Sequence, residues 1–179
     1  MGHSEPRRLE ERLVREIVLA LCLVAVAIMQ VALLPRPLGI APNLLLLLAI
    51  CQSLIAGPAR AARWAFYGGL ALDVCAGSLL GTHALALLVA VLLASLPLAR
   101  LSRENWLLPL CGVLFGAIGY YAALIALTAL FDGRISPPTY IIVAVLPDTL
   151  LTLIPALPVF MAWRAWLSRS RGEVPVDLY

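Results

Sequence analysis

The chain has 179 residues, of which 63% are hydrophobic and 13% are charged, and its mean hydropathy is +0.98. Soluble domains are nearer half apolar and a quarter charged, so this composition argues against a soluble protein and favours a single membrane domain. The formal net charge is +3 and all 13 basic residues are arginines; because they are confined to a few segments, they indicate membrane topology rather than nucleic-acid binding.

Six apolar runs follow one another along the chain, and each predicts a membrane-spanning helix. A spanning helix needs about 20 residues, so the second and third runs are short, and we expect their helices to tilt or to be shielded by neighbours. Barrel strands would alternate apolar and polar residues, which these runs do not, so the predicted fold is an all-α polytopic bundle. The runs cover residues 17–34, 44–56, 64–80, 83–99, 106–131 and 140–166.

The arginines predict how these six helices are oriented. Eleven of them fall before the first run, between the second and third, between the fourth and fifth, and at the end of the chain from Arg164 onward. All eleven lie on one side of a six-helix topology. Arg36 and Arg134 fall on the other side. Since basic residues concentrate in cytoplasmic segments, we expect both termini to be cytoplasmic. The predicted organisation is a cytoplasmic segment 1–16, a six-helix membrane domain 17–166 and a cytoplasmic tail 167–179.

Glycines at helical spacing predict close packing between helices. Gly112 and Gly116 form G-x-x-x-G in the fifth run, with Gly119 near the same face. Small residues at this spacing let helix backbones approach each other in lipid. Gly69 and Gly77 stand four residues on either side of Asp73, so we expect the carboxylate to lie between two flat patches.

Prolines and cysteines in the apolar runs have structural interpretations. Pro147, Pro155 and Pro158 predict a kinked or interrupted sixth helix. The four cysteines occur singly, in four different runs and outside any C-x-x-C motif. They are expected to be small buried side chains, and the sequence predicts neither a metal site nor a cofactor.

Two carboxylates lie within the apolar runs, where a charge is costly unless it is paired or neutralised. In the six-helix topology Asp73 lies in the outer half of the third helix, and Asn43 and His83 stand at the outer ends of the second and fourth. We expect these three side chains to converge beneath the outer surface. Asp148 is expected nearer the middle of the membrane.

Three roles compete for these polar residues. An intramembrane protease would need an activated serine, and Ser78 and His83 are present, but no nucleophile motif surrounds them. A small-solute transport subunit would use the polar cluster as a binding pocket. A non-catalytic assembly subunit would use it to fix its helices or to bind another membrane protein. The residues by themselves leave the last two alternatives open.

The segment "GGLALDVCAGSLLGTHAL" resembles the signature region of the rod shape-determining protein MreD family, which reads as G-L-x-x-D, a short G-S-x-x-G turn and H-A-L. Two departures from the family pattern stand out: Pro42-Asn43 replaces a frequent Pro-Asp, and Thr152 lies near a frequent Asn. The matching positions are Gly69, Leu70, Asp73, Gly77, Ser78, Gly81, His83, Ala84 and Leu85.

The resemblance implies a non-enzymatic subunit of the machinery that organises peptidoglycan synthesis in rod-shaped bacteria, located in the bacterial inner membrane. It implies MreC as direct partner and, indirectly, MreB, RodA and its penicillin-binding transpeptidase. It also implies a fold similar to the six-helix substrate-binding subunits of energy-coupling-factor vitamin transporters, so small-solute uptake is the alternative function. The candidate structural or partner-binding residues are Asn43, Gly69, Asp73, Gly77, Gly81, His83 and Asp148.

Overall fold

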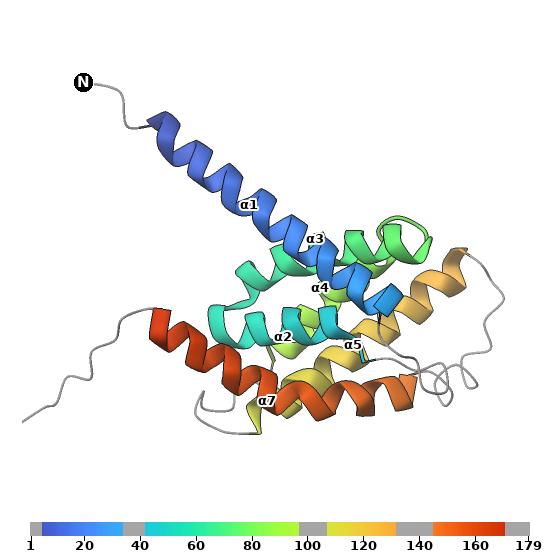
Figure 1. Ribbon diagram of the computed structural model, residues 1–179. Coiled ribbons are helices and arrows are strands. Elements are labelled where there is room, and N and C mark those ends of the chain that lie inside the picture. The colour runs from blue at the N-terminus through green and yellow to red at the C-terminus, as the bar shows by residue number, and fades with distance from the viewer. Residues whose placement is uncertain (1–4, 34–41, 97–106, 132–144, 171–179) are drawn as a thin grey trace, which may run out of the picture.

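The computed structural model describes residues 5–33, 42–96, 107–131 and 145–170, and all regular secondary structure in these ranges is helical (Figure 1). Each predicted apolar run corresponds to one helix, so the all-α prediction is confirmed for the described residues. The helices are α1 (Glu5–Ile28) with its π-helical continuation η1 (Met29–Leu33), α2 (Leu44–Ala56), α3 (Pro58–Ala76), α4 (Thr82–Ala94), α5 (Leu108–Phe131) and α7 (Leu146–Ser170).

The start of α3 and the continuity of α7 differ from the prediction. Helix α3 begins at Pro58 rather than near Trp64, so only Gly57 separates it from α2. Gly57 has a φ of 91°, which favours glycine, and proline fits the first turn of a helix, where its missing N–H is not needed. The sixth helix was expected to be kinked or interrupted at its prolines; α7 continues through Pro155 and Pro158, so an interruption is wrong. Membrane helices tolerate internal proline where neighbouring groups satisfy the freed carbonyls.

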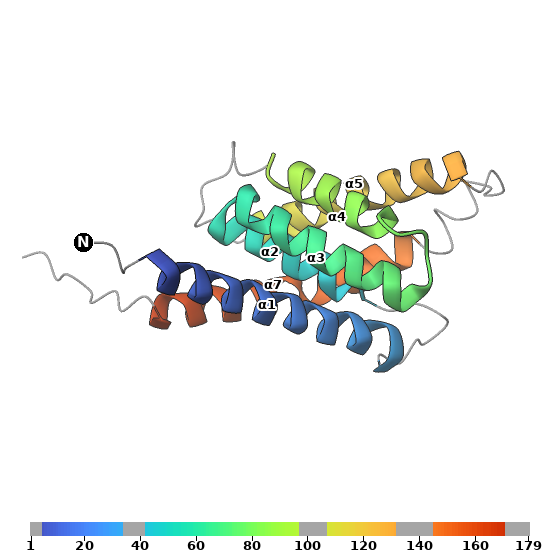
Figure 2. The same ribbon diagram turned by 90° about the horizontal axis from the view of Figure 1, so that it is seen from above.

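The middle of α1 lies beside the start of α3 at one end of the bundle (Figure 2), and the first half of α1 extends beyond it. Glu16 of α1 forms an ion pair with Arg63 of α3, with 2.5 Å between Oε1 and Nη1. Trp64, next along α3, packs edge to face on Trp163 near the end of α7, with ring centroids 5.4 Å apart. We call this end, which carries Arg15, Arg60, Arg63 and Arg164, the arginine end.

Contacts at the opposite end of the bundle involve the starts of α2, α4 and α7. Asn43, the N-cap of α2, hydrogen bonds to Thr152 in the second turn of α7. His83 in the first turn of α4 has its ring centroid 6.3 Å from that of Tyr120 in α5. Helices α1 and α3 therefore run away from the arginine end, while α2, α4 and α7 run toward it. We call this opposite end, after its buried carboxylate, the Asp73 end.

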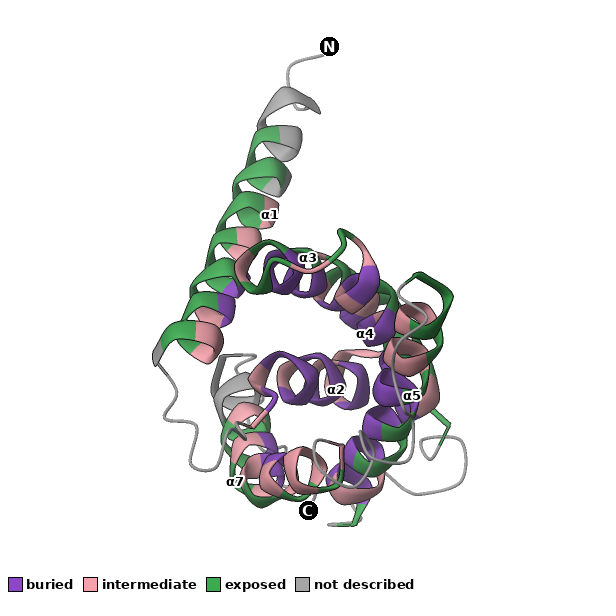
Figure 3. Cartoon of the chain, turned by 90° about the vertical axis from the view of Figure 1, so that its right-hand side faces the viewer, coloured by how far each residue is buried: buried purple, intermediate pink, exposed green. Residues whose placement is uncertain are grey.

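Helix α2 occupies the centre of the bundle, where Figure 3 shows it between α3, α5 and α7. Eight of its 13 residues are buried, so this short helix is shielded by its neighbours, as predicted. Gly112 and Gly116 of α5 face Leu54 and Ile50 of α2, and Gly119 faces α4. The predicted packing role of these three glycines is confirmed.

Three of the helices are long and apolar enough to cross a membrane: Leu13–Ala32, Leu108–Phe131 and Leu146–Ala165. Helices α2 and α4 are apolar but shorter, with 13 residues each. Only 11% of the most apolar window of the first span and 17% of that of the last are buried, whereas 44% of the window in α5 is buried. Apolar surfaces of this extent are suited to lipid, and they leave α1 and α7 on the outside of the bundle.

Gly69 permits the closest approach of α3 to α4, and this generates a first prediction. A Cβ atom at Gly69 would overlap the backbone of His83 and Ala84. Because backbone cannot move aside as a side chain can, Gly69→Ala should lower the free energy of unfolding by about 1–3 kcal/mol, measured by denaturant titration in detergent.

Gly112→Ala is the matched control, because its Cβ would meet side chains and no backbone: the tip of Leu54 at 3.0 Å and Ile50 Cγ2 at 3.3 Å. It should change the free energy of unfolding by less than about 1 kcal/mol, a change that the better helix propensity of alanine partly offsets. Equal stability of the two variants would show that α3 and α4 are not packed as described.

Candidate functional site

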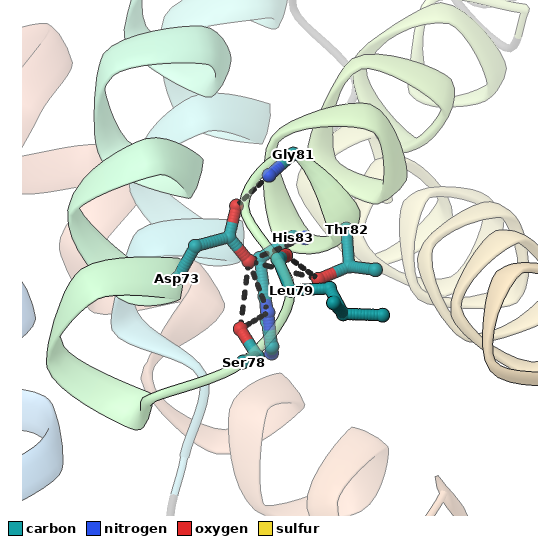
Figure 4. Close-up of polar contacts among 6 residues, drawn as sticks. All are labelled: Asp73, Ser78, Leu79, Gly81, Thr82 and His83. Carbon is teal, nitrogen blue, oxygen red and sulfur yellow. Dashed lines mark hydrogen bonds and ion pairs between the residues drawn. The ribbon is translucent and has the colours of Figure 1, made fainter. Parts of the chain in front are cut away.

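The carboxyl group of Asp73, in the last turn of α3, is the most densely hydrogen-bonded side chain among the described residues. Its side chain is buried, with a residue exposure of 1%. Oδ1 accepts from the Ser78 hydroxyl at 2.9 Å, the Thr82 hydroxyl at 3.0 Å, the His83 backbone N–H at 2.9 Å and His83 Nδ1 at 2.8 Å. Oδ2 accepts from the Gly81 N–H at 2.8 Å (Figure 4). The predictions that Asp73 is enclosed and that it pairs with His83 are confirmed.

The carboxylate caps the start of α4 from the neighbouring helix. The first N–H groups of a helix have no partner within it and are usually satisfied by a side chain at the N-cap. In α4 the N-cap is Gly81, which has no side chain to offer. Asp73 instead accepts from the N–H groups of Gly81 and His83, and the positive end of the helix dipole also favours an acidic group there.

Two glycines give the α3–α4 turn the conformation that brings these donors together. Gly77 has a φ of 66° and ends α3 in the left-handed conformation, and its N–H bonds to the carbonyl of Asp73. Gly81 has a φ of 99° just before α4. Gly77 was expected to provide a packing surface beside Asp73, and that is wrong: it is exposed, and nothing lies within 4 Å of where its Cβ would be. Because α3 ends at Ala76, spacing by four no longer places Gly77 on a helical face.

Ser78, His83 and Asp73 are close together but do not form a proton relay. Ser78 Oγ lies 3.2 Å from His83 Nδ1, the same nitrogen that lies 2.8 Å from Asp73 Oδ1. In a hydrolase the serine and the aspartate use opposite ring nitrogens, so that one holds a proton while the other accepts one. An ionised carboxylate can only accept, so the Nδ1 that faces Asp73 is the nitrogen that carries the proton, and it cannot also take the serine proton. The three side chains are therefore arranged to hold the turn, not to activate a nucleophile.

Asn43 belongs to a second polar cluster, which joins η1, α2 and α7. Its Oδ1 accepts from the N–H of Leu46 at 3.1 Å and from Gln30 Nε2 at 3.3 Å. Its own N–H donates to Thr152 Oγ1 at 3.0 Å, and Gln30 Oε1 accepts from the N–H of Leu45. The expectation that Asn43 converges on Asp73 is wrong, because its side chain is used to cap α2.

Asp148 lies in the first turn of α7 and is half-buried. Its backbone carbonyl accepts from the Thr152 hydroxyl at 2.7 Å, one turn from the Asn43 contact. Asp148 therefore belongs to the end of the bundle where α2 begins. The expected depth of Asp148 in the membrane was counted along the helix from Pro138. Residues 132–144 lie outside the described residues.

Thr82 and Gln30 were not predicted as site residues. The Thr82 hydroxyl lies 3.0 Å from Asp73 Oδ1 and 2.5 Å from the carbonyl of Leu79, so its single proton serves one acceptor at a time. A threonine at the start of an apolar run is a recognised helix-start signal and could have drawn attention to it. Within the described residues, no group of three His, Cys, Asp or Glu side chains could hold a metal ion.

These observations define an all-helical membrane protein in which a buried carboxylate closes the turn between two helices. A family model described as rod shape-determining protein MreD matches residues 11–163. The chain belongs to the MreD family. No curated protein and no solved structure matches it.

The two departures from the family pattern are partners in the structure. Asn43, which replaces a frequent aspartate, donates its N–H to Thr152, which lies near a frequent asparagine. Both residues are buried, with exposures of 5% and 0%. At these two positions the backbone N–H of Asn43 and the hydroxyl of Thr152 join the start of α2 to α7.

The donor pattern around Asp73 generates a second prediction. All five described hydrogen bonds to the Asp73 carboxyl group are accepted by its oxygens. Asparagine would point its NH₂ group at one or more of these donors. Asp73→Asn should therefore lower the free energy of unfolding in detergent by about 1–3 kcal/mol, and Asp73→Ala by more.

Ser78→Ala is the control, because it removes one donor and leaves the others in place. It should cost no more than about 1 kcal/mol. An Asp73→Asn variant as stable as the unmodified chain would contradict the acceptor-only description of this site.

Proposed function

We propose that the chain is a non-catalytic subunit of the bacterial rod (elongation) complex, set in the cell inner membrane, where it binds MreC. Through MreC it is connected to MreB, RodA and the penicillin-binding transpeptidase, and so helps to organise peptidoglycan synthesis. The family match over residues 11–163 carries this proposal, since it spans most of the chain and is described by rod shape determination.

The proposed topology has six membrane crossings with both termini in the cytoplasm, in a bundle similar to the substrate-binding subunits of energy-coupling-factor transporters. Helices α1 and α3 begin at the arginine end and α7 finishes there, which supports a cytoplasmic location for that end. The first helix runs away from the arginine end and the last helix runs toward it, which supports an even number of crossings.

A non-catalytic role is supported by the chemistry of the Asp73 site. Its one serine–histidine contact uses the histidine nitrogen that already faces the carboxylate. The acceptor atoms of Asp73 are all directed at the α3–α4 turn, so the group is used to fix the position of α4. We expect a partner to recognise the surface that this fixed turn and the neighbouring helices form.

Topology reporters give a third prediction. Fusions after Gly57 and Ser102 should report a cytoplasmic location, and those after Pro37 and Gly133 an external one, because eleven of 13 arginines then lie in the cytoplasm. Paired alkaline phosphatase and green fluorescent protein fusions measure this. A cytoplasmic signal at Gly133 would rule out six crossings.

Co-purification with MreC from native membranes gives a fourth prediction. Asp73→Ala should insert in normal amounts but retain at least tenfold less MreC, and cells relying on it should lose their rod shape, because the start of α4 is no longer held. Tenfold corresponds to about 1.4 kcal/mol, within the cost of losing buried hydrogen bonds.

Thr128→Ala is the control for loss of a hydroxyl within a membrane helix. Thr128 bonds only to carbonyls of its own helix, those of Leu124 and Ile125, among the described residues. It should retain MreC fully. Normal MreC recovery with Asp73→Ala would show that the fixed turn plays no part in recognition, and absence of MreC from the unmodified chain would overturn the proposed function.

A further inference from the structure

A cavity of about 580 Å³ opens at the arginine end, far from the Asp73 site. It lies between the middle of α1, the end of α2 and the start of α3. The polar and aromatic residues that line it are Arg15, Glu16, Gln52, Arg60, Arg63 and Trp64. Three guanidinium groups and one carboxylate leave the lining with a net positive charge.

Two of these arginines have no anionic partner in the part of the chain that the structure describes. Glu16 Oε1 is taken by Arg63, which holds α1 and α3 together. Arg15 and Arg60 are exposed and form no ion pair with any described residue. Glu16 Oε2 is buried and has no hydrogen-bond partner among the described residues. The cavity thus offers two arginines that have no anionic partner among the described residues.

The cavity lies at the level where the apolar helices begin. The first apolar span starts at Leu13, just before Arg15. In α3 the apolar sequence starts at Trp64, just after Arg63. Trp64 lines the cavity and packs on Trp163, and tryptophan favours the boundary between headgroups and hydrocarbon. A group that fills the cavity would therefore be at the depth of lipid headgroups.

The chemistry of the lining matches a phosphate group. Guanidinium groups bind phosphate oxygens through paired N–H donors, and basic pockets between membrane helices hold lipid headgroups. Arg60 also lies in the first turn of α3, where the helix dipole adds positive charge and Gly57 provides no side-chain cap.

We propose that this cavity binds the headgroup of an anionic phospholipid of the phosphatidylglycerol class, with Arg15 and Arg60 on the phosphate. The cavity and the Asp73 turn lie at opposite ends of the bundle. Binding would fix α1 against α3 through the lipid as well as through the Glu16–Arg63 ion pair.

The test measures binding of short-chain dihexanoyl-phosphatidylglycerol to the full chain in neutral detergent, by the shift in its unfolding temperature across a lipid titration. The unmodified chain should bind this lipid at least tenfold more tightly than dihexanoyl-phosphatidylcholine, and binding should weaken as salt is added. The double substitution Arg15→Gln and Arg60→Gln should reduce affinity for phosphatidylglycerol at least tenfold.

Arg164→Gln is the matched control, because Arg164 is exposed at the arginine end but does not line the cavity. It should leave lipid affinity unchanged. If the double variant does not purify, Arg60→Gln alone must weaken binding at least threefold.

Four results would overturn the proposal. Equal affinity for phosphatidylcholine, or an effect of Arg164→Gln as large as that of the double variant, would show general attraction to the surface. Inorganic phosphate that binds as tightly as the lipid would assign the cavity to a free anion. An acidic peptide such as oligoglutamate that binds more tightly than the lipid would assign it to a cytoplasmic protein partner.

Discussion

The carboxyl group of Asp73 must find its hydrogen-bond donors inside the protein, and the arrangement of α3, the turn and α4 depends on that requirement. An unsatisfied buried acceptor costs about 1–3 kcal/mol, and this group has two oxygens at 1% exposure. Backbone N–H groups at the start of α4 can meet it only if α4 begins beside the last turn of α3. Gly69 makes that approach possible, and Gly77 and Gly81 give the turn its left-handed conformations. The hydrogen bonds of this one side chain therefore depend on glycine at all three positions.

The sequence was sufficient to predict the helices and the pairing of Asp73 with His83. Apolar runs fix where helices can lie in lipid, and a short connection brings the end of one helix to the start of the next. The sequence did not reveal that backbone donors complete the site, because this depends on the dihedral angles of the turn. Gly77 illustrates the difficulty: its spacing fits a helical face until the helix end is known. Asn43 and Thr152 are 109 residues apart, and no local pattern predicts such a contact.

The start of α3 was misplaced for a related reason. Arginines between apolar runs usually indicate a loop, but long side chains can extend from a helix toward the headgroups while their stems cover apolar surface. Arg60 and Arg63 do lie on a helix, and Arg63 reaches Glu16 on α1. The segment is therefore both the cytoplasmic signal that the charge pattern indicated and a structural part of the bundle. Arg60 and Arg63 also line the cavity at the arginine end.

The bundle divides into a packed core and two outer helices that are attached differently. Helices α2 to α5 are joined through small residues and buried apolar side chains, as Gly112, Gly116 and Gly119 illustrate. The apolar spans of α1 and α7 are mostly exposed, and both are tied by polar bonds to the start of α2, through Gln30 and Thr152. These hydrogen bonds fix the positions of α1 and α7 but bury little of their apolar surface. The sides of α1 and α7 that face away from the rest of the bundle are thus left to lipid or to the helix of a partner.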